Sequence, residues 1–487
     1  MSTTAEGKAI RHAKHTSDPA IEAKEGSIHT SSDEDADLNR LGLETPAKRD
    51  IGLLGIVALG WNICNSWSAI SATLAISVVS GGPVTLLYGI ILIFVLGGAC
   101  ALSMAEIASV YPTAGGQYHW TSILAPRPYS RVLSYCCGSV NFLGWIANGA
   151  GFIIQMPVIV LSLAAYLDPT YTPKTWHIFL VFQAFNFAFA AYNIFLMKRT
   201  AWIHDIGCTK QDTSFVWTTF INESGWSASG VVFLTGLLNP NFIYSGLDGA
   251  IHLAEECTHA ASTIPRALLS TIIIGFVSAF AFSVAMLYSF TDIEPVLSSP
   301  LPILEIWSQA SGSSAAATVF VLVLTTCGCF ACTGALQTAS RLTWSFARDD
   351  AVVFSPFLRK VNGRLGVPVN ALLVNSALVG VLGFVFLGSS TAFNALVATG
   401  LILQQVSFAF PAALALFRLP RVVGFASNIL TVVTGVVALI FYDFPVVMPV
   451  TASNMNYACV VIGVMALFSV GNWFGYANRR YRGPRLD

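Results

Sequence analysis

Residues 246–256 read GLDGAIHLAEE and place four ionisable side chains directly after an apolar stretch, VVFLTGLLNPNFIYS, at 231–245. The four side chains are Asp248, His252, Glu255 and Glu256. Inside a membrane an unpaired charge is expensive, and ionisable residues there usually have a function. The stretch therefore raises two questions: whether the chain lies in a membrane, and what these groups do there.

The composition answers the first question. Of 487 residues, 55% are hydrophobic and 10% are charged, whereas soluble domains carry about 25% charged residues. So little charge cannot cover a soluble core that is this apolar. The sequence therefore predicts an all-α polytopic membrane protein.

Three regions follow from the distribution of polar residues. Residues 1–50 have no apolar run, and we expect a disordered cytoplasmic tail without a signal peptide. Residues 51–475 form the membrane domain, and 476–487 form a short basic cytoplasmic tail. Most of the ten cysteines lie in apolar runs, so we interpret Cys327, Cys329 and Cys332 as packing residues and expect no metal site.

A membrane helix needs about 20 mostly apolar residues. About eleven runs meet this criterion: 51–80, 84–105, 132–166, 176–197, 228–252, 267–290, 315–338, 369–388, 391–417, 423–441 and 457–475.

The charges between these runs predict their sides, because short loops rich in Lys and Arg stay in the cytoplasm. The loops read as external contain one lysine, Lys174, and several acids: Asp168, Asp292, Glu294, Glu305 and Asp443. The other loops hold the basic residues Arg127, Arg131, Lys198, Arg199, Arg266, Arg341, Arg348, Arg359, Lys360, Arg364, Arg418, Arg421, Arg479, Arg480, Arg482 and Arg485. We expect an integral protein of the plasma membrane with its amino terminus in the cytoplasm.

The alternation of sides fails at one place. The runs 176–197 and 228–252 both end at loops assigned to the cytoplasm, yet only one run lies between those loops. The connecting sequence is too polar to span. A helix is therefore missing between about Ile206 and Ser214, which is an inference from charge alone.

Three motifs at the cytoplasmic side carry a family resemblance: EIASVYPTAGGQY at 106–118, EECTHAASTIPRA at 255–267 and SRLTWSFARD at 340–349. Together they resemble the amino acid–polyamine–organocation transporter superfamily, and within it the fungal permeases of amino acids, GABA and choline. The resemblance covers about residues 50–485. His259 and Asp349-Asp350 depart from the pattern of many relatives.

The resemblance implies twelve helices in the leucine-transporter-like fold, which has two inverted five-helix repeats and broken first and sixth helices. It makes 228–252 the sixth helix, so the missing span is the fifth. Some relatives have a coupling lysine in the fifth helix, which cannot be found here.

Broken helices offer N–H groups to anions and carbonyl groups to cations, which suits amine and amino acid substrates. In the first run we expect Gly60 to permit unwinding, and the predicted substrate-binding residues there are Gly60, Trp61, Asn62, Asn65 and Ser66. The alternative is that these polar groups bridge neighbouring helices.

The second part of the predicted substrate site comes from later runs, with Asn148, Tyr244, Ser245, Gly246 and Asp248. Weaker candidates are Phe152, Thr326 and the pair Gln404-Gln405, and an aromatic wall of Trp61 and Tyr244 for a substrate amine.

The ionisable residues of the opening stretch have two predicted roles. Asp248 contacts a substrate amine or takes a coupling proton, or it caps the following helix. His252 lies on the same helical face and either relays a proton or is merely packed. Glu255 and Glu256 are expected to pair with Arg341 or Arg348 and close an inner gate, or to be a solvated pair.

The sequence thus predicts a secondary active permease for amino acids or amines such as GABA or choline, which works by alternating access with proton coupling. The partners are the substrate, the proton and the lipid bilayer, and we expect neither a cofactor nor nucleic acid. No phosphate-binding loop or nucleophile–base arrangement indicates an enzyme. The alternatives are a nutrient sensor that binds without transporting, and an inactive product of altered splicing or a faulty gene model.

Overall fold

The computed structural model describes residues 52–71, 80–168, 170–195, 213–289, 292–299, 301–363, 365–417, 422–445, 447–452 and 454–483. Within these ranges the regular structure is helical, which confirms the all-α polytopic class. The predicted amino-terminal tail, 1–50, lies outside the described residues.

Among the described residues, nine helices are long and apolar enough to cross a membrane. They coincide with nine of the eleven predicted runs. They are α4 (Gly82–Val110), α6 (Arg127–Leu167), α7 (Thr175–Phe195), α11 (Ala260–Ser289), α14 (Ser314–Arg348), α16 (Val369–Gly388), α17 (Ser390–Ala415), α18 (Val422–Phe441) and α19 (Ala458–Asn472), which continues through η3 (Trp473–Ala477) and α20 (Asn478–Arg480).

The other two predicted runs are interrupted. In the run 51–80, α2 (Leu53–Cys64) ends and a second helical piece covers 66–71. The run 228–252 consists of the short pieces α9 (Ser229–Gly236), α10 (Leu238–Asn241), η1 (Phe242–Tyr244) and η2 (Leu247–Glu256). The connections contain α5 (Gln117–Leu124), α8 (Thr213–Thr218), α12 (Ile293–Ser298), α13 (Pro302–Ser311) and α15 (Ser355–Leu358).

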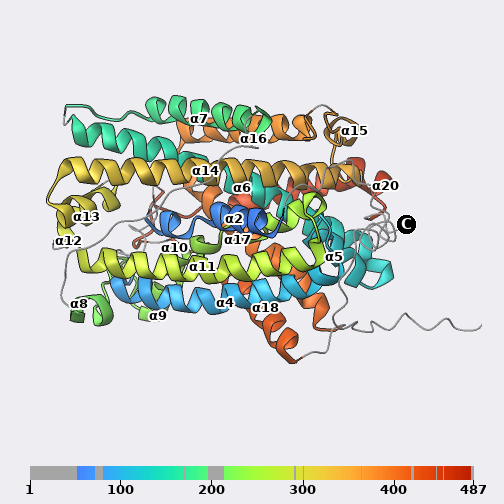
Figure 1. The fold of residues 1–487 in the computed structure, drawn as a ribbon, viewed down its shortest axis with the longest axis horizontal. Helices are drawn as coiled ribbons and strands as arrows, with labels where there is room; N and C mark the ends of the chain where they lie inside the picture. Colours follow the sequence, from blue (N-terminus) through green and yellow to red (C-terminus); the bar gives the residue numbers. More distant parts are fainter. Residues whose placement is uncertain are drawn as a thin grey trace, which may run out of the picture.

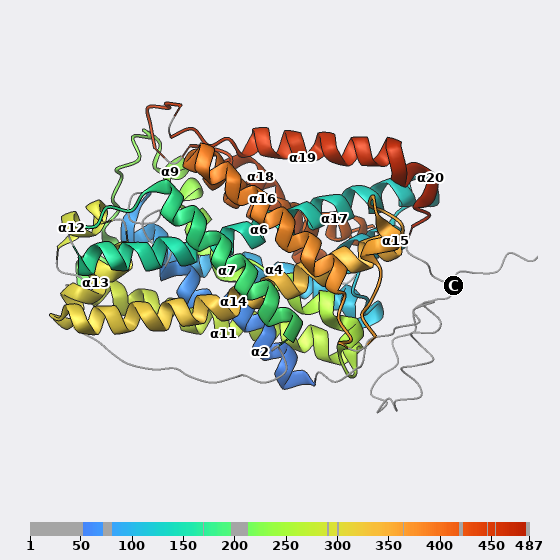
Figure 2. The same cartoon turned by 90° about the horizontal axis from the view of Figure 1, so that it is seen from above.

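The long helices run side by side along the horizontal axis of Figure 1. α7 and α16 form the upper layer, α4 and α11 form the lower layer, and α2, α6, α14 and α17 lie between them. Seen from above, α19 and α20 lie along one edge (Figure 2). The two interrupted segments are therefore enclosed by longer helices.

Small residues bring the central helices close together. A Cβ at Gly400 of α17 would lie 2.5 Å from the Asn148 Oδ1 atom of α6, and one at Gly151 of α6 would lie 2.9 Å from Val397 of α17. Helices in lipid gain little from hydrophobic burial, so such close backbone contact is a main source of their association.

The basic and acidic loops lie at opposite ends of the bundle. In Figure 1, α5, α15 and α20 lie at the right and α8, α12 and α13 at the left. We call the end with α5, α15 and α20 the basic end, because Arg131 and Arg348 lie there. The opposite end carries acidic residues: Asp292 directly before α12, Glu294 in α12 and Glu305 in α13. The basic and acidic loops of the sequence thus lie at opposite ends of the molecule.

The helices on either side of the predicted gap end at opposite ends of the molecule. α7 pairs antiparallel with α16, because Gln183 Nε2 donates to the Gly380 carbonyl and Asn186 Nδ2 to the Ser376 carbonyl. α7 therefore ends beside the start of α16, at the basic end. Trp217 of α8 donates instead to Tyr288, at the far end of α11. The predicted gap itself, between Ile206 and Ser214, lies mostly outside the described residues.

The carboxyl-terminal segment lies against the basic end rather than apart from it. The Tyr481 side chain is fully buried, and its hydroxyl is 2.6 Å from the hydroxyl of Ser134. Its ring contacts the rings of Tyr135 and Phe346. This part of the predicted basic tail, 476–487, is thus an element of the fold.

Candidate functional site

The first break is at Asn65. This residue has φ 39° and ψ 51°, a left-handed conformation that ends α2, and its carbonyl starts the next helical piece by accepting from the Ala69 N–H. Asparagine is one of the few residues that adopt this conformation readily.

The predicted unwinding at Gly60 is wrong, since α2 continues through it. Gly60 instead allows α11 to approach, because a Cβ there would lie 2.7 Å from the Thr271 hydroxyl oxygen.

The second break is at Ser245 and Gly246. Gly246 has φ +86°, and a Cβ there would lie 2.5 Å from Ile63 and 3.3 Å from Trp145. Glycine is needed both for the left-handed backbone and for the space. The Ser66 hydroxyl donates to the Ile243 carbonyl at 2.7 Å, so the two breaks lie next to each other.

A small cavity of about 20 Å³ opens beside Asn65, between α2, α6, η1 and α14. This is room for about one water molecule, so a substrate can enter only if helices move apart. No charged side chain is among its lining residues, which are Ile63, Cys64, Asn65, Ser68, Ala69, Phe152, Gln155, Met156, Ile159, Phe242, Gly328, Ala331 and Cys332.

The predicted substrate-binding residues differ in their positions. Asn65 lines the cavity, and Ser66 follows it and joins the two breaks. Trp61 and Asn62 are half-buried residues of α2 that do not line it. The rings at the cavity are those of Phe152 and Phe242, not the predicted wall of Trp61 and Tyr244.

The other predicted residues lie deeper in the protein. Tyr244 donates its hydroxyl to the Ile272 carbonyl at 3.1 Å, and Ser245 is fully buried. Asn148 packs against the backbone of Gly400. The weaker candidate Thr326 is exposed on α14, and its hydroxyl donates to the Leu322 carbonyl of the same helix.

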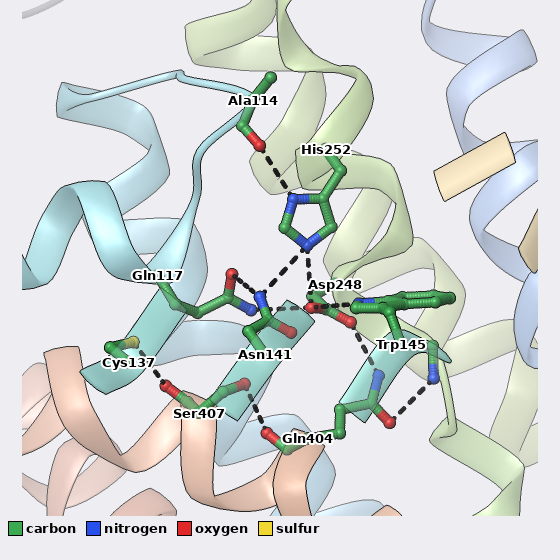
Figure 3. Close-up of polar contacts among 10 residues, drawn as sticks. Ala114, Gln117, Cys137, Asn141, Trp145, Asp248, His252, Gln404 and Ser407 are labelled. Atoms are coloured by element: carbon green, nitrogen blue, oxygen red, sulfur yellow. Dashed lines mark hydrogen bonds and ion pairs between the residues drawn. The ribbon is translucent and has the colours of Figure 1, made fainter. Parts of the chain in front are cut away.

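Asp248 lies at the centre of a buried polar network (Figure 3). Its Oδ1 accepts from Gln404 Nε2 at 2.8 Å. Its Oδ2 accepts from Gln117 Nε2 at 2.9 Å and from Trp145 Nε1 at 3.2 Å, and it lies 3.1 Å from His252 Nε2. Both ionisable side chains are fully buried. Asp248 is not among the residues that line the cavity.

The network connects four helices and a loop. Gln117 begins α5, Trp145 comes from α6 and Gln404 from α17. Asn141 of α6 donates to Gln117 at 3.1 Å, and His252 Nδ1 lies 2.9 Å from the Ala114 carbonyl in the loop before α5. The segment 247–256 is thereby fastened to the parts of the molecule that close its basic end.

The predicted ion pairs of Glu255 and Glu256 are present. Arg348 forms a bidentate pair with Glu255 at 2.8 and 2.9 Å, and Arg341 pairs with Glu256 at 2.8 Å. The Glu255 side chain is only 1% exposed, and it also accepts from the Ala114 N–H at 3.3 Å. The two acids are therefore partners of α14, and not a solvated pair.

Comparison with known proteins identifies the class. The sequence model of the family described as "Amino acid permease" matches residues 51–210 and again 206–465. The chain belongs to the amino acid permease family. The resemblance found in its three motifs is thereby confirmed, and the permease is a membrane transport protein.

The permease is similar in sequence to several transporters from fungi and a plant. It is 34% identical to "Choline transporter" of Saccharomyces cerevisiae, over 91% of this chain and 83% of that protein. It is 30% identical to "Swainsonine transporter swnT" of Arthroderma benhamiae, over 90% of this chain and 93% of that protein. It is 27% identical to "Amino-acid permease BAT1" of Arabidopsis thaliana, over 92% of this chain and 95% of that protein.

The alignment with the choline transporter is longer than the part of this permease that it covers. It runs over 473 positions, whereas 91% of 487 residues is about 443 residues, so at least about 30 positions have no residue here. The family match is also divided, and its two parts meet at 206–210.

Sequence reasoning missed three members of the polar network. Gln117 stood in a recognised motif but received no role, Asn141 and Trp145 were not singled out, and Gln404 was only a weak candidate. Asn141 and Gln404 carried an available signal, because they are amides inside apolar runs and such groups need partners in lipid, whereas Gln117 lies between two runs and Trp145 is not an amide. Their common partner, Asp248, lies 103 to 156 positions away from Trp145, Gln117 and Gln404.

Proposed function

We propose that this permease is a secondary active transporter of small organic amines, in the plasma membrane, with the substrate bound beside Asn65. The observation that carries the proposal is the cavity where the two breaks meet. It lies beside Asn65, where α2 ends, and Phe152 and Phe242 are among its lining residues.

The lining of the cavity favours a cationic group. The carboxyl-terminal end of α2 carries partial negative charge, and Phe152 and Phe242 offer ring faces for a cation–π contact. No basic side chain lines the cavity to hold a carboxylate. The Gly246 N–H, a possible donor to an anion, already donates to Gln404 Oε1 at 3.2 Å. A quaternary amine such as choline is therefore the first candidate, ahead of GABA and neutral amino acids.

Transport by alternating access is the mechanism that these features support. The two breaks would be those of the first and sixth helices in a leucine-transporter-like pair of inverted repeats. Asp248 would belong to the coupling site, and the pairs of Arg348 with Glu255 and Arg341 with Glu256 would be the inner gate. A proton is the proposed coupling ion, and the amino terminus would lie in the cytoplasm.

We further propose that the transporting form contains a fifth helix that this chain lacks. α7 ends at the basic end and α8 lies at the opposite end. The 17 residues between them would reach about 26 Å as a helix, less than the roughly 30 Å of a bilayer core, and five of them are charged. The division of the family match at 206–210 supports the same location, and the unmatched positions of the choline transporter are numerous enough for one further helix.

Two measurements test the proposal in order. The first is the sequence of transcripts across the codons for Lys198 to Trp226: an extra apolar segment of about 20 residues is expected. The second is uptake of labelled choline by proteoliposomes that contain the encoded protein, with GABA and neutral amino acids as competitors.

Phe152→Leu should weaken choline uptake, whereas Phe187→Leu is the matched control, because Phe187 is 65% exposed on α7. Strong competition by neutral amino acids, with no effect of Phe152→Leu, would contradict the amine assignment. Substrate binding without uptake would favour a nutrient sensor. Transcripts that match this chain, together with neither binding nor uptake, would favour an inactive product.

A further inference from the structure

Each ring nitrogen of His252 has an acceptor within hydrogen-bond distance, and the Asn141 Nδ2 atom lies farther off, 3.5 Å from Nε2. Nδ1 lies 2.9 Å from the Ala114 carbonyl oxygen, which can only accept, so Nδ1 carries a proton. Nε2 lies 3.1 Å from Asp248 Oδ2, and a proton must lie between these two atoms for the contact to be favourable. The remaining question is which of the two residues owns it.

The other partners of Asp248 assign that proton to the histidine. Oδ2 already accepts from Gln117 and Trp145, and Oδ1 accepts from Gln404. A protonated carboxyl oxygen would have to accept two hydrogen bonds while it donates a third, and it is a much weaker acceptor than a carboxylate oxygen, so three donors favour the carboxylate. The pair is thus a carboxylate and an imidazolium, neutral as a whole and fully buried.

The imidazolium holds the loop that closes the basic end. Ala114 lies in the loop between α4 and α5, and its N–H donates to Glu255, which Arg348 holds. Gly116 of the same loop has φ +55°, and a Cβ there would lie 3.1 Å from Ile251 and 3.3 Å from His252. The loop therefore contacts the histidine and the ion pair at once.

We propose that His252 carries the coupling proton and that its release loosens the closure at the basic end. The inference rests on the proposed function. When the imidazolium loses its proton to water, the neutral ring has one N–H and can donate either to Ala114 or to Asp248. Either the loop loses its hydrogen bond to His252, or the Asp248 carboxylate keeps its charge in the membrane with one donor fewer, a costly state that entry of water relieves.

Other ionisable groups surround the pair without replacing it. Cys64 of α2 lies near Asp248, and Glu255 on η2 is neutralised by Arg348 of α14. Among the described residues of α5, His119 is a second fully enclosed histidine, 1% exposed. Gln117 and Trp145 are neutral, as are Asn141 and Gln404. His252 is therefore the group of this network that gains or loses charge when one proton moves.

Labelling of Cys257 tests the inference without requiring transport. Cys257 follows Glu256 and is 3% exposed, so it should become accessible when the basic end opens, whereas Cys459 is already exposed. The full chain in nanodiscs is treated with N-ethylmaleimide, and the ratio of labelled Cys257 to labelled Cys459 is measured by peptide mass spectrometry. Between about pH 5 and about pH 8, where imidazole groups titrate, the ratio should rise about fivefold.

Two variants decide the outcome. His252→Gln should remove the pH dependence of the ratio, and His119→Gln should keep it. A wild-type ratio that does not change with pH, or an unchanged transition in His252→Gln, would overturn the proposal. If His252→Gln does not fold, Asp248→Asn serves instead: without the carboxylate the imidazolium is less stable, so the transition must move to lower pH, and an unmoved midpoint rejects the inference.

The uptake assay separates the two hypotheses. Uptake that depends on pH together with a flat labelling ratio would place the coupling proton elsewhere and leave the proposed function intact. A clear labelling transition without uptake of any amine would retain the switch at His252 and reject transport.

Discussion

The ion pair between Arg348 and Glu255 allows the sharpest test of how the basic end is held. Arg348→Gln removes the guanidinium but leaves a carboxylate whose side chain is 1% exposed. Its described donor would then be the Ala114 N–H at 3.3 Å, a long hydrogen bond. Loss of one partner from a buried pair costs about 3 to 5 kcal/mol. Because Arg348 itself is 23% exposed, we expect the lower value, about 3 kcal/mol.

The reverse substitution should cost less. In Glu255→Gln the arginine loses its carboxylate but keeps partial hydration and its position over the Trp344 ring, 4.7 Å from the ring centroid. We expect about 1 to 2 kcal/mol. The double variant pairs two neutral groups and should cost about 1 kcal/mol, so the cycle gives a coupling energy of about 3 to 4 kcal/mol.

The assay measures the free energy of unfolding in detergent, from a urea titration monitored by tryptophan fluorescence. Arg359→Gln is the matched control, because its pair with Asp350 is 3.6 Å long and Arg359 is 45% exposed. That variant should change stability by less than about 0.5 kcal/mol. A loss below about 1 kcal/mol for Arg348→Gln, or a double variant equal to the sum of the single ones, would refute the reasoning.

Three further predictions concern other contacts. Gly246→Ala should destabilise the protein by about 2 to 4 kcal/mol, because it combines a left-handed backbone with a clash against Ile63. Gly230→Ala is the control, because nothing lies within 4 Å of a Cβ there. Equal unfolding free energies of the two variants would disprove the account. Tyr481→Ala should lower the unfolding midpoint and leave a cavity beside Phe346, at a cost of about 3 kcal/mol; a loss no larger than that of Arg482→Ala would show that the tail is not docked. Burial raises the pKa of Asp443, in the loop after α18. Because the unfolded carboxyl has the lower pKa, wild-type stability falls as the pH rises toward the raised value, so Asp443→Asn should be the more stable protein at neutral pH and lose this advantage in acid; an advantage independent of pH would contradict the sign.

Composition, motifs and loop charges were enough to predict the fold class, the family and the difference in charge between the two ends of the bundle. Low charge in long apolar runs leaves helices in a membrane as the physical solution, and the uneven distribution of arginines marks one end. Spacing within one segment also predicted that His252 lies within reach of Asp248, and the two side chains are 3.1 Å apart within η2, which is a 3₁₀ helix. Complementary charge was sufficient to suggest the partners of Glu255 and Glu256.

The position of the first helix break and the groups that meet at the site depend on contacts between helices, which the sequence pattern did not predict. Gly60 suggested a break by its backbone freedom, yet contact with α11 keeps it helical, and Asn65 takes the left-handed turn. The rings at the cavity come from α6 and η1, and the donors to Asp248 come from α5, α6 and α17. A pattern along the chain describes the faces of a single helix, whereas partners on different helices are chosen by close packing between them, which no local spacing encodes.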